Sequence, residues 1–368
     1  METVTPESNL YGEAYRRFAG RRILVTGHTG FKGSWLALWL AELGAHVTGY
    51  ALPPVGENAL FDDLGLTKTI DHRVGDIRDL AALKTVVEDA KPEIVFHLAA
   101  QALVRRSYGD PLETFTTNVT GGANLLEAVR HAPSVKALVF ITSDKAYDNK
   151  EWVWGYRETD ALGGKDPYSA SKAAAEIVFR AYWESYLAKR AGFGAATTRA
   201  GNVIGGGDWS ADRLIPDCIR ALKQGAPIII RNPNATRPWQ FVLEPLSGYL
   251  DLALALLDRP SDFSSPWNFG PLDGDFLTVE QVASRVLGIW GEGALRKEVD
   301  PNAAHEATLL HLSIDKALAQ LRWRPVYSGH EAIRVTTEWY RLRHQGGAAR
   351  DISLRQIRDF VAARKRND

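Results

Sequence analysis

A tyrosine and a lysine four residues apart mark the part of the chain best suited to acid–base chemistry. Tyr168 and Lys172 follow Asp166-Pro167, a pair typical of a helix start, so both side chains are expected on one face of a helix. A free tyrosine has a pKa of about 10, and a lysine ammonium beside it favours the phenolate. Such a phenolate can remove the proton of an alcohol.

The segment 136–141 is predicted to be a strand, and Ser143, Asp144 and Lys145 stand just after its end. Ser143 can hydrogen-bond the same alcohol as Tyr168, and Asp144 and Lys145 add an acid and an amine beside it. Tyrosine and lysine at this spacing also occur as an ordinary helix pair, but a serine at a strand end upstream favours a catalytic set. The residues therefore predict oxidation of an alcohol to a ketone, with a hydride passing to a cofactor.

The cofactor site is predicted from three glycines between the apolar strand 23–26 and a helix that starts at Ser34. Gly27 permits a tight turn, Gly30 lets the backbone approach a pyrophosphate, and Gly33 lets the helix pack closely on the strand. This pattern predicts a bound dinucleotide, whose oxidised nicotinamide ring would further favour a tyrosine phenolate. The predicted cofactor-binding residues are Gly27, Thr29, Gly30, Phe31, Lys32, Gly33, Asp76, Ile77, Ala99, Ala100, Gln101, Tyr168 and Lys172.

The choice between NAD and NADP stays open at this point. The second predicted strand, 45–51, ends without the acid that holds the adenosine ribose in many NAD-binding folds. Asp76 could accept from the adenine amino group, while helix capping by Asp79 is the structural alternative for that stretch. Lys32 could place a charge near the phosphates, or it could be an exposed lysine at a helix start.

Strands and helices alternate along the first part of the chain. Further strands are predicted at 70–75, 93–98 and 195–199, and this alternation is typical of a parallel, doubly wound sheet. We predict an α/β fold with a Rossmann-type NAD(P)-binding domain over 1–204. A smaller α/β substrate lobe is expected over 205–345, with some segments returning to the first domain, and an amphipathic helix over 346–368 closes the chain.

The composition excludes several classes of function. Lysine plus arginine and aspartate plus glutamate both number 44, so the protein has no overall field for nucleic acid or a membrane. The first twenty residues lack the apolar core of a signal, and no apolar run approaches the roughly 18 residues of a membrane span. The one cysteine, Cys218, fits a buried site in a reducing compartment, so a cytoplasmic protein is expected. No metal site is predicted.

Long motifs then resemble the extended short-chain dehydrogenase/reductase family, in particular its nucleotide-sugar branch. The resemblance runs from about residue 20 to about residue 345, and four motifs carry it: the glycine turn 26–33, Ser143-Asp144-Lys145, the segment 199–209, and Arg237-Pro238-Trp239-Gln240. The branch usually has a histidine where Phe241 stands, which affects the expected packing but not the chemistry.

The resemblance implies a 4,6-dehydratase that acts on CDP-D-glucose with bound NAD, in deoxysugar biosynthesis such as that of lipopolysaccharide O-antigen. Asp144 would then be the acid toward the sugar's 6-hydroxyl. Lys145 would be the base at position 5, or a charge that stabilises the enolate. The implied substrate-binding residues are Asn202, Leu214, Ile215 and Arg237, although a turn-stabilising asparagine and a rim ion pair remain structural alternatives for the first and last.

The resemblance also implies at least a homodimer, or a tetramer, built through helices over about 112–130 and 168–189. Two rival functions remain. A nucleotide-sugar 4-epimerase would need Tyr168, Lys172 and Ser143 but not Asp144 and Lys145. A non-catalytic NAD-binding regulator would have no reason to keep the full set.

Overall fold

The computed structural model describes residues 14–56, 58–272, 276–298 and 310–367. The first thirteen of the twenty residues in which no signal was expected lie outside the described residues. Its centre is a seven-stranded sheet in which the paired strands run parallel, in the order β11-β6-β5-β4-β1-β2-β3. The order steps outward in both directions from β1, which is the doubly wound arrangement predicted from the sequence. The strands are β1 (Arg22–Thr26), β2 (His46–Ala51), β3 (Asp71–Val74), β4 (Ile94–His97), β5 (Ala137–Ile141), β6 (Gly194–Arg199) and β11 (Trp267–Asn268).

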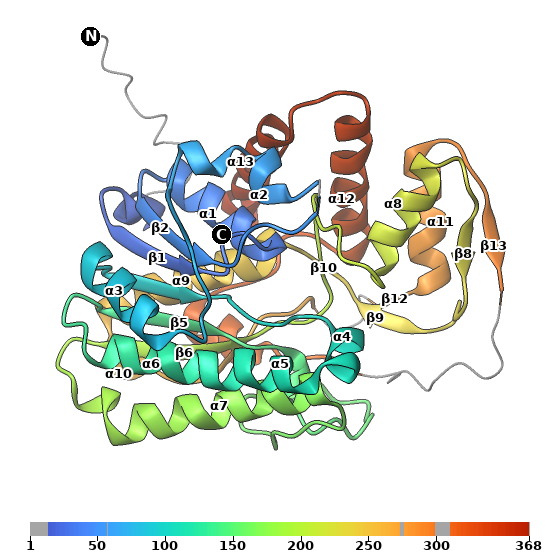
Figure 1. The fold of residues 1–368 in the computed structure, drawn as a ribbon. Helices are drawn as coiled ribbons and strands as arrows, with labels where there is room; N and C mark the ends of the chain where they lie inside the picture. Colours follow the sequence, from blue (N-terminus) through green and yellow to red (C-terminus); the bar gives the residue numbers. More distant parts are fainter. Residues whose placement is uncertain (1–13, 57, 273–275, 299–309, 368) are drawn as a thin grey trace, which may run out of the picture.

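Helices cover both faces of this sheet because its strands are apolar on both sides (Figure 1). Alternate residues of one strand enter different cores: Ile23 and Val25 join one hydrophobic cluster, and Leu24 joins the other. One face carries α3 (Leu80–Ala90), α6 (Gly121–Arg130) and α7 (Pro167–Ser185), and the other carries α1 (Phe31–Glu42) and α9 (Leu243–Asp258). Helix α13 (Ala349–Asn367) packs on α1, and α12 (Gly329–His344) packs on α13 and on the smaller lobe.

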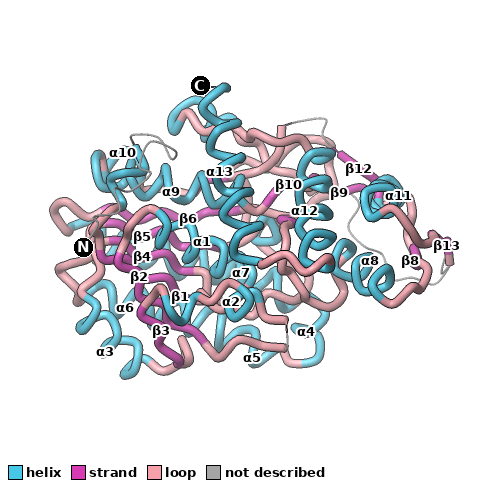
Figure 2. The backbone as a smooth tube through the Cα atoms, turned by 90° about the horizontal axis from the view of Figure 1, so that it is seen from above, coloured by secondary structure: helices cyan, strands magenta, loops and turns pink. Residues whose placement is uncertain are grey.

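A smaller group of elements stands beside the carboxyl end of the sheet, at the right of Figures 1 and 2. It contains α8 (Leu214–Lys223), α11 (Val279–Trp290) and three short strand pairs. The pairs are β8 (Ile228–Ile230) with β13 (Leu295–Lys297), β9 (Thr236–Pro238) with β12 (Phe276–Thr278), and β7 (Val203–Ile204) with β10 (Gln240–Phe241). After residue 204 the chain also returns to the sheet, because α9 packs on β5 and β11 pairs with β6.

The remaining elements are short connections. They are the 3-10 turns Ala14–Phe18, Leu66–Lys68, Asp144–Ala146 and Leu187–Lys189, the π-helical segments Thr116–Thr120 and Ala317–Leu321, and α2 (Leu60–Asp63), α4 (Val104–Gly109), α5 (Pro111–Phe115) and α10 (Pro260–Phe263). The helix expected over about 112–130 is therefore α5, a π-helical turn and α6 in succession. In the part of the chain that the structure describes, no helix is both long and apolar enough to cross a membrane.

Two sequence expectations about packing can be checked directly. Cys218 is a free thiol that is 1% exposed, which confirms the buried site predicted for it. Phe241, where related chains usually have histidine, is fully buried and its ring lies against the rings of Trp35, Tyr327 and Phe360. An apolar ring thus fills an apolar site, and the departure from the family pattern is absorbed by packing.

A buried ion pair joins the helix that carries Tyr168 to the sheet. Glu176 in α7 accepts two hydrogen bonds from Arg199 at the end of β6, at 2.8 and 2.9 Å, and both side chains are almost fully enclosed. Thr142 and Thr197 also donate to this carboxylate, at 2.6 and 2.7 Å. Burial acts to raise the pKa of Glu176, but Arg199 and the two threonines hold it below its usual value.

We expect Arg199→Met to lower the free energy of unfolding by about 3–5 kcal/mol, because it leaves the Glu176 carboxylate buried without its cation. Urea unfolding measures the change. The control is Arg259→Met, which breaks an exposed pair with Asp262 and should cost less than about 1 kcal/mol. Equal losses in the two variants would show that burial does not set the strength of the Glu176 interaction.

Candidate active site

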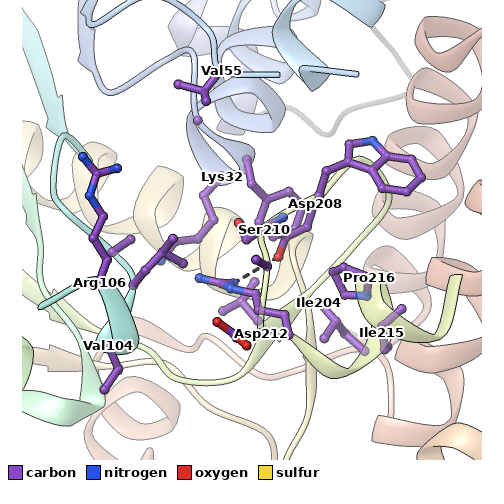
Figure 3. Close-up of a pocket in the computed structure, with 18 of the residues that line it drawn as sticks. Lys32, Val55, Val104, Arg106, Ile204, Asp208, Ser210, Asp212, Ile215 and Pro216 are labelled. Atoms are coloured by element: carbon purple, nitrogen blue, oxygen red, sulfur yellow. Dashed lines mark hydrogen bonds and ion pairs between the residues drawn. The ribbon is translucent and has the colours of Figure 1, made fainter. Parts of the chain in front are cut away.

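A cleft of about 1800 Å³ runs along the carboxyl ends of the sheet strands and out to the smaller lobe. Carboxyl ends are where open parallel sheets bind ligands. All of the predicted site residues line this cleft except Lys172, which is 5% exposed and lies behind the wall. Figure 3 shows Lys32 and Asp208 near the middle of the cleft, with Arg106 at the left and Ile215 and Pro216 at the right, on the side of the smaller lobe.

The glycine turn has the backbone geometry that the sequence predicted. Gly27 has φ of +76°, and a Cβ atom on it would lie 2.6 Å from the backbone nitrogen of Ala99. A Cβ on Gly33 would lie 2.1 Å from the Gly27 carbonyl oxygen, so α1 packs on the turn only because neither residue has a side chain.

Gly30 differs from the other two glycines because its missing side chain leaves space on the cleft side. A Cβ there would meet nothing of the chain closer than 3.4 Å. Gly30 is also the N-cap of α1 and makes no side-chain capping bond, so the start of this helix is a cradle for an anion. The turn therefore fits the pyrophosphate of a dinucleotide.

Two predicted cofactor residues also have partners within the fold. The Asp76 carboxylate forms an ion pair with Arg78 at 2.6 Å, and the neighbouring Asp79 caps α3 by accepting from the Ala82 N–H at 3.0 Å. The capping alternative for Asp79 is thus confirmed. Gln101 lines the cleft, but its side-chain amide donates to the Leu103 carbonyl and the Thr114 hydroxyl. Gln101 consequently shapes the loop after β4 through these bonds.

Ser143, Asp144 and Lys145 lie where β5 ends, and hydrogen bonds fix their arrangement. The Ser143 hydroxyl donates to Asp144 Oδ1 at 3.0 Å and accepts from the Lys145 backbone N–H at 3.2 Å. Asp144 is 4% exposed and lies against the backbone of Gly201, where a Cβ would come within 1.9 Å of its Oδ2 atom. The loop after β6 therefore requires glycine at this position.

Tyr168 faces the same group of residues from the first turn of α7. Burial raises the pKa of Tyr168 above its usual value, the interaction with Ser143 opposes the rise, and the charge of Asp144 adds to it. Lys172 Nζ lies 6.0 Å from the centre of the tyrosine ring. In the protein without ligands, burial therefore opposes the phenolate expected from the Tyr–Lys spacing. A positive charge bound in the cleft is needed to lower this pKa.

Two lysines share this part of the cleft. Burial, reinforced by the charge of Lys32, lowers the pKa of Lys172 to about 7. Burial and the charge of Arg213 lower the pKa of Lys32 to about 8, and Asp144 counteracts that effect. The alternative of an exposed Lys32 is wrong, since its side chain is partly buried and reaches into the cleft (Figure 3). The site gathers positive charge where an anionic ligand would neutralise it.

The expected substrate residues stand on the lobe side of the cleft. Asn202 has φ of +46°, and Arg237 donates to the Thr236 carbonyl at 2.8 Å while lining the cleft. Sequence reasoning missed Arg213, which precedes α8 and donates to Asp208 at 3.1 Å. Its charge acts on both Lys32 and Tyr168, so it faces the reacting groups. The only sequence signal for Arg213 was that a cation stands directly before the predicted helix.

The described residues hold no group of three or more histidine, cysteine or acidic side chains that could bind a metal ion.

The fold and the site define a class of enzymes that comparison with known proteins identifies. Residues 23–264 match the NAD dependent epimerase/dehydratase family, and the chain belongs to that family. It is 48% identical over 351 residues to the CDP-glucose 4,6-dehydratase of Salmonella typhimurium, covering 94% of this chain and 98% of that protein. It is 26% identical over 337 residues to the human dTDP-D-glucose 4,6-dehydratase, covering 87% and 90% of the two chains.

Solved structures agree with this assignment. The dTDP-glucose 4,6-dehydratase DesIV from Streptomyces venezuelae, described with NAD bound, is 25% identical with a TM-score of 0.73 and covers 89% of this chain and 98% of its own. The UDP-glucose 4-epimerase of Thermus thermophilus, also described with NAD, is 27% identical with a TM-score of 0.72 and covers 87% and 99%. NAD is therefore the cofactor that the glycine turn accommodates.

We predict that Lys32→Met raises the unfolding temperature of the protein without ligands at pH 7. The fold lowers the pKa of Lys32 from 10.5 to about 8, so the charged lysine destabilises the folded state fully below pH 8. This penalty disappears as the pH rises to 10.5, where the unfolded chain also loses the proton. The gain measured by differential scanning fluorimetry should accordingly shrink between pH 7 and pH 10.5.

Lys189→Met serves as the control, because Lys189 is an exposed lysine in the turn after α7 and should show no such pH-dependent gain. A gain for Lys32→Met that stays the same at both pH values would contradict the electrostatic origin of the effect.

Proposed function

We propose that this protein is a CDP-D-glucose 4,6-dehydratase, which converts CDP-D-glucose to CDP-4-dehydro-6-deoxy-D-glucose and water. The observation that carries the proposal is the presence of Ser143, Asp144, Lys145 and Tyr168 on one cleft, directly beside the cradle for NAD. The 48% identity with the Salmonella enzyme supports the choice of CDP-D-glucose among the nucleotide sugars.

Oxidation at position 4 comes first in the proposed reaction. NAD, when bound, accepts a hydride from carbon 4 of the sugar and later returns it to carbon 6. Tyr168 removes the proton of the 4-hydroxyl, and Ser143 hydrogen-bonds the same oxygen. Positive charge is required to lower the pKa of the buried phenol, and Arg213 contributes part of it. Lys172 lies one turn after Tyr168 in α7, and its amino group adds positive charge beside the tyrosine ring.

Elimination follows because the ketone at position 4 makes the proton at position 5 acidic. We assign Lys145 as the base that removes this proton, with stabilisation of the enolate as its competing role. Asp144 donates a proton to the departing 6-hydroxyl, which leaves as water. Return of the hydride to carbon 6 restores the oxidation level of the sugar, and Lys145, after proton exchange with solvent, supplies the proton at carbon 5.

The substrate diphosphate and nucleotide have their own proposed partners. Arg237 offers a two-pronged donor to the diphosphate, and Asn202 offers a hydrogen bond beside it. Leu214 and Ile215 form an apolar wall for the nucleotide, where α8 borders the cleft. The proposed division of the chain is a cofactor domain over 1–204, a lobe over 205–345 that mainly binds substrate, and a closing helix over 346–368.

The experiment that tests the function compares CDP-, dTDP-, GDP- and UDP-linked hexoses with the NAD-loaded protein. We expect a 4-keto-6-deoxy product, identified by mass and NMR, from CDP-D-glucose. In heavy water the product should carry deuterium at carbon 5, because Lys145 exchanges its proton with solvent. A 4-epimer without deuterium at carbon 5 would instead establish an epimerase, which would leave Asp144 and Lys145 without a role.

Lys145→Ala should separate the two stages of the reaction. The variant keeps Ser143 and Tyr168, so hydride abstraction proceeds, but removal of the proton at carbon 5 loses its base. Rapid mixing with CDP-D-glucose should show reduced cofactor accumulating at 340 nm without dehydrated product. Lys150→Ala is the control, because Lys150 lies on the same connection but is exposed and outside the cleft. Normal turnover by Lys145→Ala would end the assignment.

We further propose a cytoplasmic homodimer, with a tetramer as the next possible assembly. Large apolar side chains stand exposed on the helices expected at the interface, with Leu112 75% and Ile177 51% exposed. Burying such side chains is typical of a stable contact between subunits. Light scattering on the purified protein measures the mass, and a monomer would contradict the proposal.

A further inference from the structure

A second, much smaller cavity lies behind Asp144, on the side away from the large cleft. Its volume is about 10 Å³, close to the minimum that holds one water molecule. Asp144 lines both spaces, so its carboxyl group forms part of the wall between them. Gly201, Gln240, His311 and Leu312 contribute to the rest of the small cavity. Any polar atom in this cavity therefore acts on the proposed acid from behind.

Gln240 presents a fixed hydrogen-bond acceptor at this cavity. The side chain is 1% exposed, and its Nε2 group donates to the carbonyl oxygens of Gly201 at 2.9 Å and Phe269 at 3.1 Å. Two carbonyl acceptors settle which end of the amide is the nitrogen. The Oε1 atom is consequently an acceptor, and among the described residues it has no hydrogen-bond partner.

His311 brings a second buried polar atom to the same cavity. Its Nδ1 atom is also without a partner in the part of the chain that the structure describes. An imidazole nitrogen is a donor or an acceptor according to its tautomer. A buried acceptor left without a hydrogen bond costs free energy, so both atoms call for a small polar molecule between them and Asp144.

We propose that this cavity holds one water molecule, which joins Asp144 to Gln240 and His311 and makes Gln240 a positioning residue for the acid. One water can accept from one of these groups and donate to two others, which matches the three or so bonds typical of buried water. With Ser143 holding Oδ1 at 3.0 Å from the front, the water holds the carboxyl from behind. The inference rests on the role of Asp144 in the proposed function.

Loss of this support should affect elimination alone. Gln240→Leu removes the fixed acceptor, so the acid loses its orientation while Ser143 and Tyr168 keep theirs. Rapid mixing of the NAD-loaded variant with CDP-D-glucose should show reduced cofactor appearing at a rate within about twofold of the unaltered protein. Its decay, which reports elimination and hydride return, should slow about ten- to a hundredfold, with KM unchanged.

His311 provides a matched pair of variants that does not alter the amide. His311→Phe keeps a ring against Phe276 but removes the nitrogen, so it should slow the decay as Gln240→Leu does. His311→Asn restores a polar atom near the position of Nδ1 and should recover most of the rate. Leu312→Met conserves volume in the same wall without a polar atom, and it should leave both phases unchanged.

The crystal structure of the holoenzyme should contain one ordered water within hydrogen-bond distance of Asp144, Gln240 and His311. A side chain filling the cavity, or an unchanged decay in both Gln240→Leu and His311→Phe, would overturn the inference. These outcomes leave the proposed function standing. If the unaltered protein neither reduces its cofactor nor releases dehydrated product with CDP-D-glucose, the proposed function itself fails.

Discussion

The buried carboxylate of Glu176 is the interaction on which the site depends most. It lies one helical turn beyond Lys172 in α7, and it binds Thr142, which directly precedes Ser143, together with Thr197 and Arg199 at the end of β6. One carboxylate therefore fixes the helix of Tyr168, the strand end of Ser143 and the strand that leads to Gly201. The reacting groups come from distant parts of the chain, and this polar cluster holds them in register.

Crowded positive charge is the second constraint. Lys32, Lys172 and Arg213 act on one another or on Tyr168 within a partly enclosed space, and burial lowers the pKa of both lysines. Such a cluster of like charges destabilises the folded protein, and clusters of this kind are typical of sites that bind a ligand of opposite charge. The diphosphate groups of a dinucleotide and of a nucleotide sugar supply the matching negative charge. The ligand-free protein is thus strained electrostatically in the region where it binds anions.

Much of the fold follows from local sequence. The strands 23–26, 94–97 and 137–141 are almost entirely apolar in sequence. The three glycines of the turn have the spacing that close packing of a helix on a strand requires. Other elements could not be predicted in this way. Strand β11 has two residues, too few to show a period, and its place beside β6 is set by the returning chain. The π-helical turn after α5 interrupts a segment whose apolar spacing predicts one continuous helix.

The site residues likewise separate into those that the local sequence predicts and those that it does not. Tyr168, Lys172 and the Ser143-Asp144-Lys145 run were predictable because their spacing is local. The lowered pKa of Lys32 was not, because burial by the folded chain causes it and the charge of Arg213, about 180 residues further along the chain, adds to it. The cavity behind Asp144 likewise joins Gly201 and His311, which lie in loops, to Gln240 in β10. Only the folded chain brings these groups together.

In the proposed reaction, one cleft oxidises carbon 4 of the hexose and returns the same hydride to carbon 6. The most direct measurement uses CDP-D-glucose with deuterium at carbon 4 and locates the label in the product by NMR. Internal hydride transfer should place deuterium in the methyl group at carbon 6 of the same sugar molecule. Deuterium that stays at carbon 4, or that is lost to solvent, would contradict it.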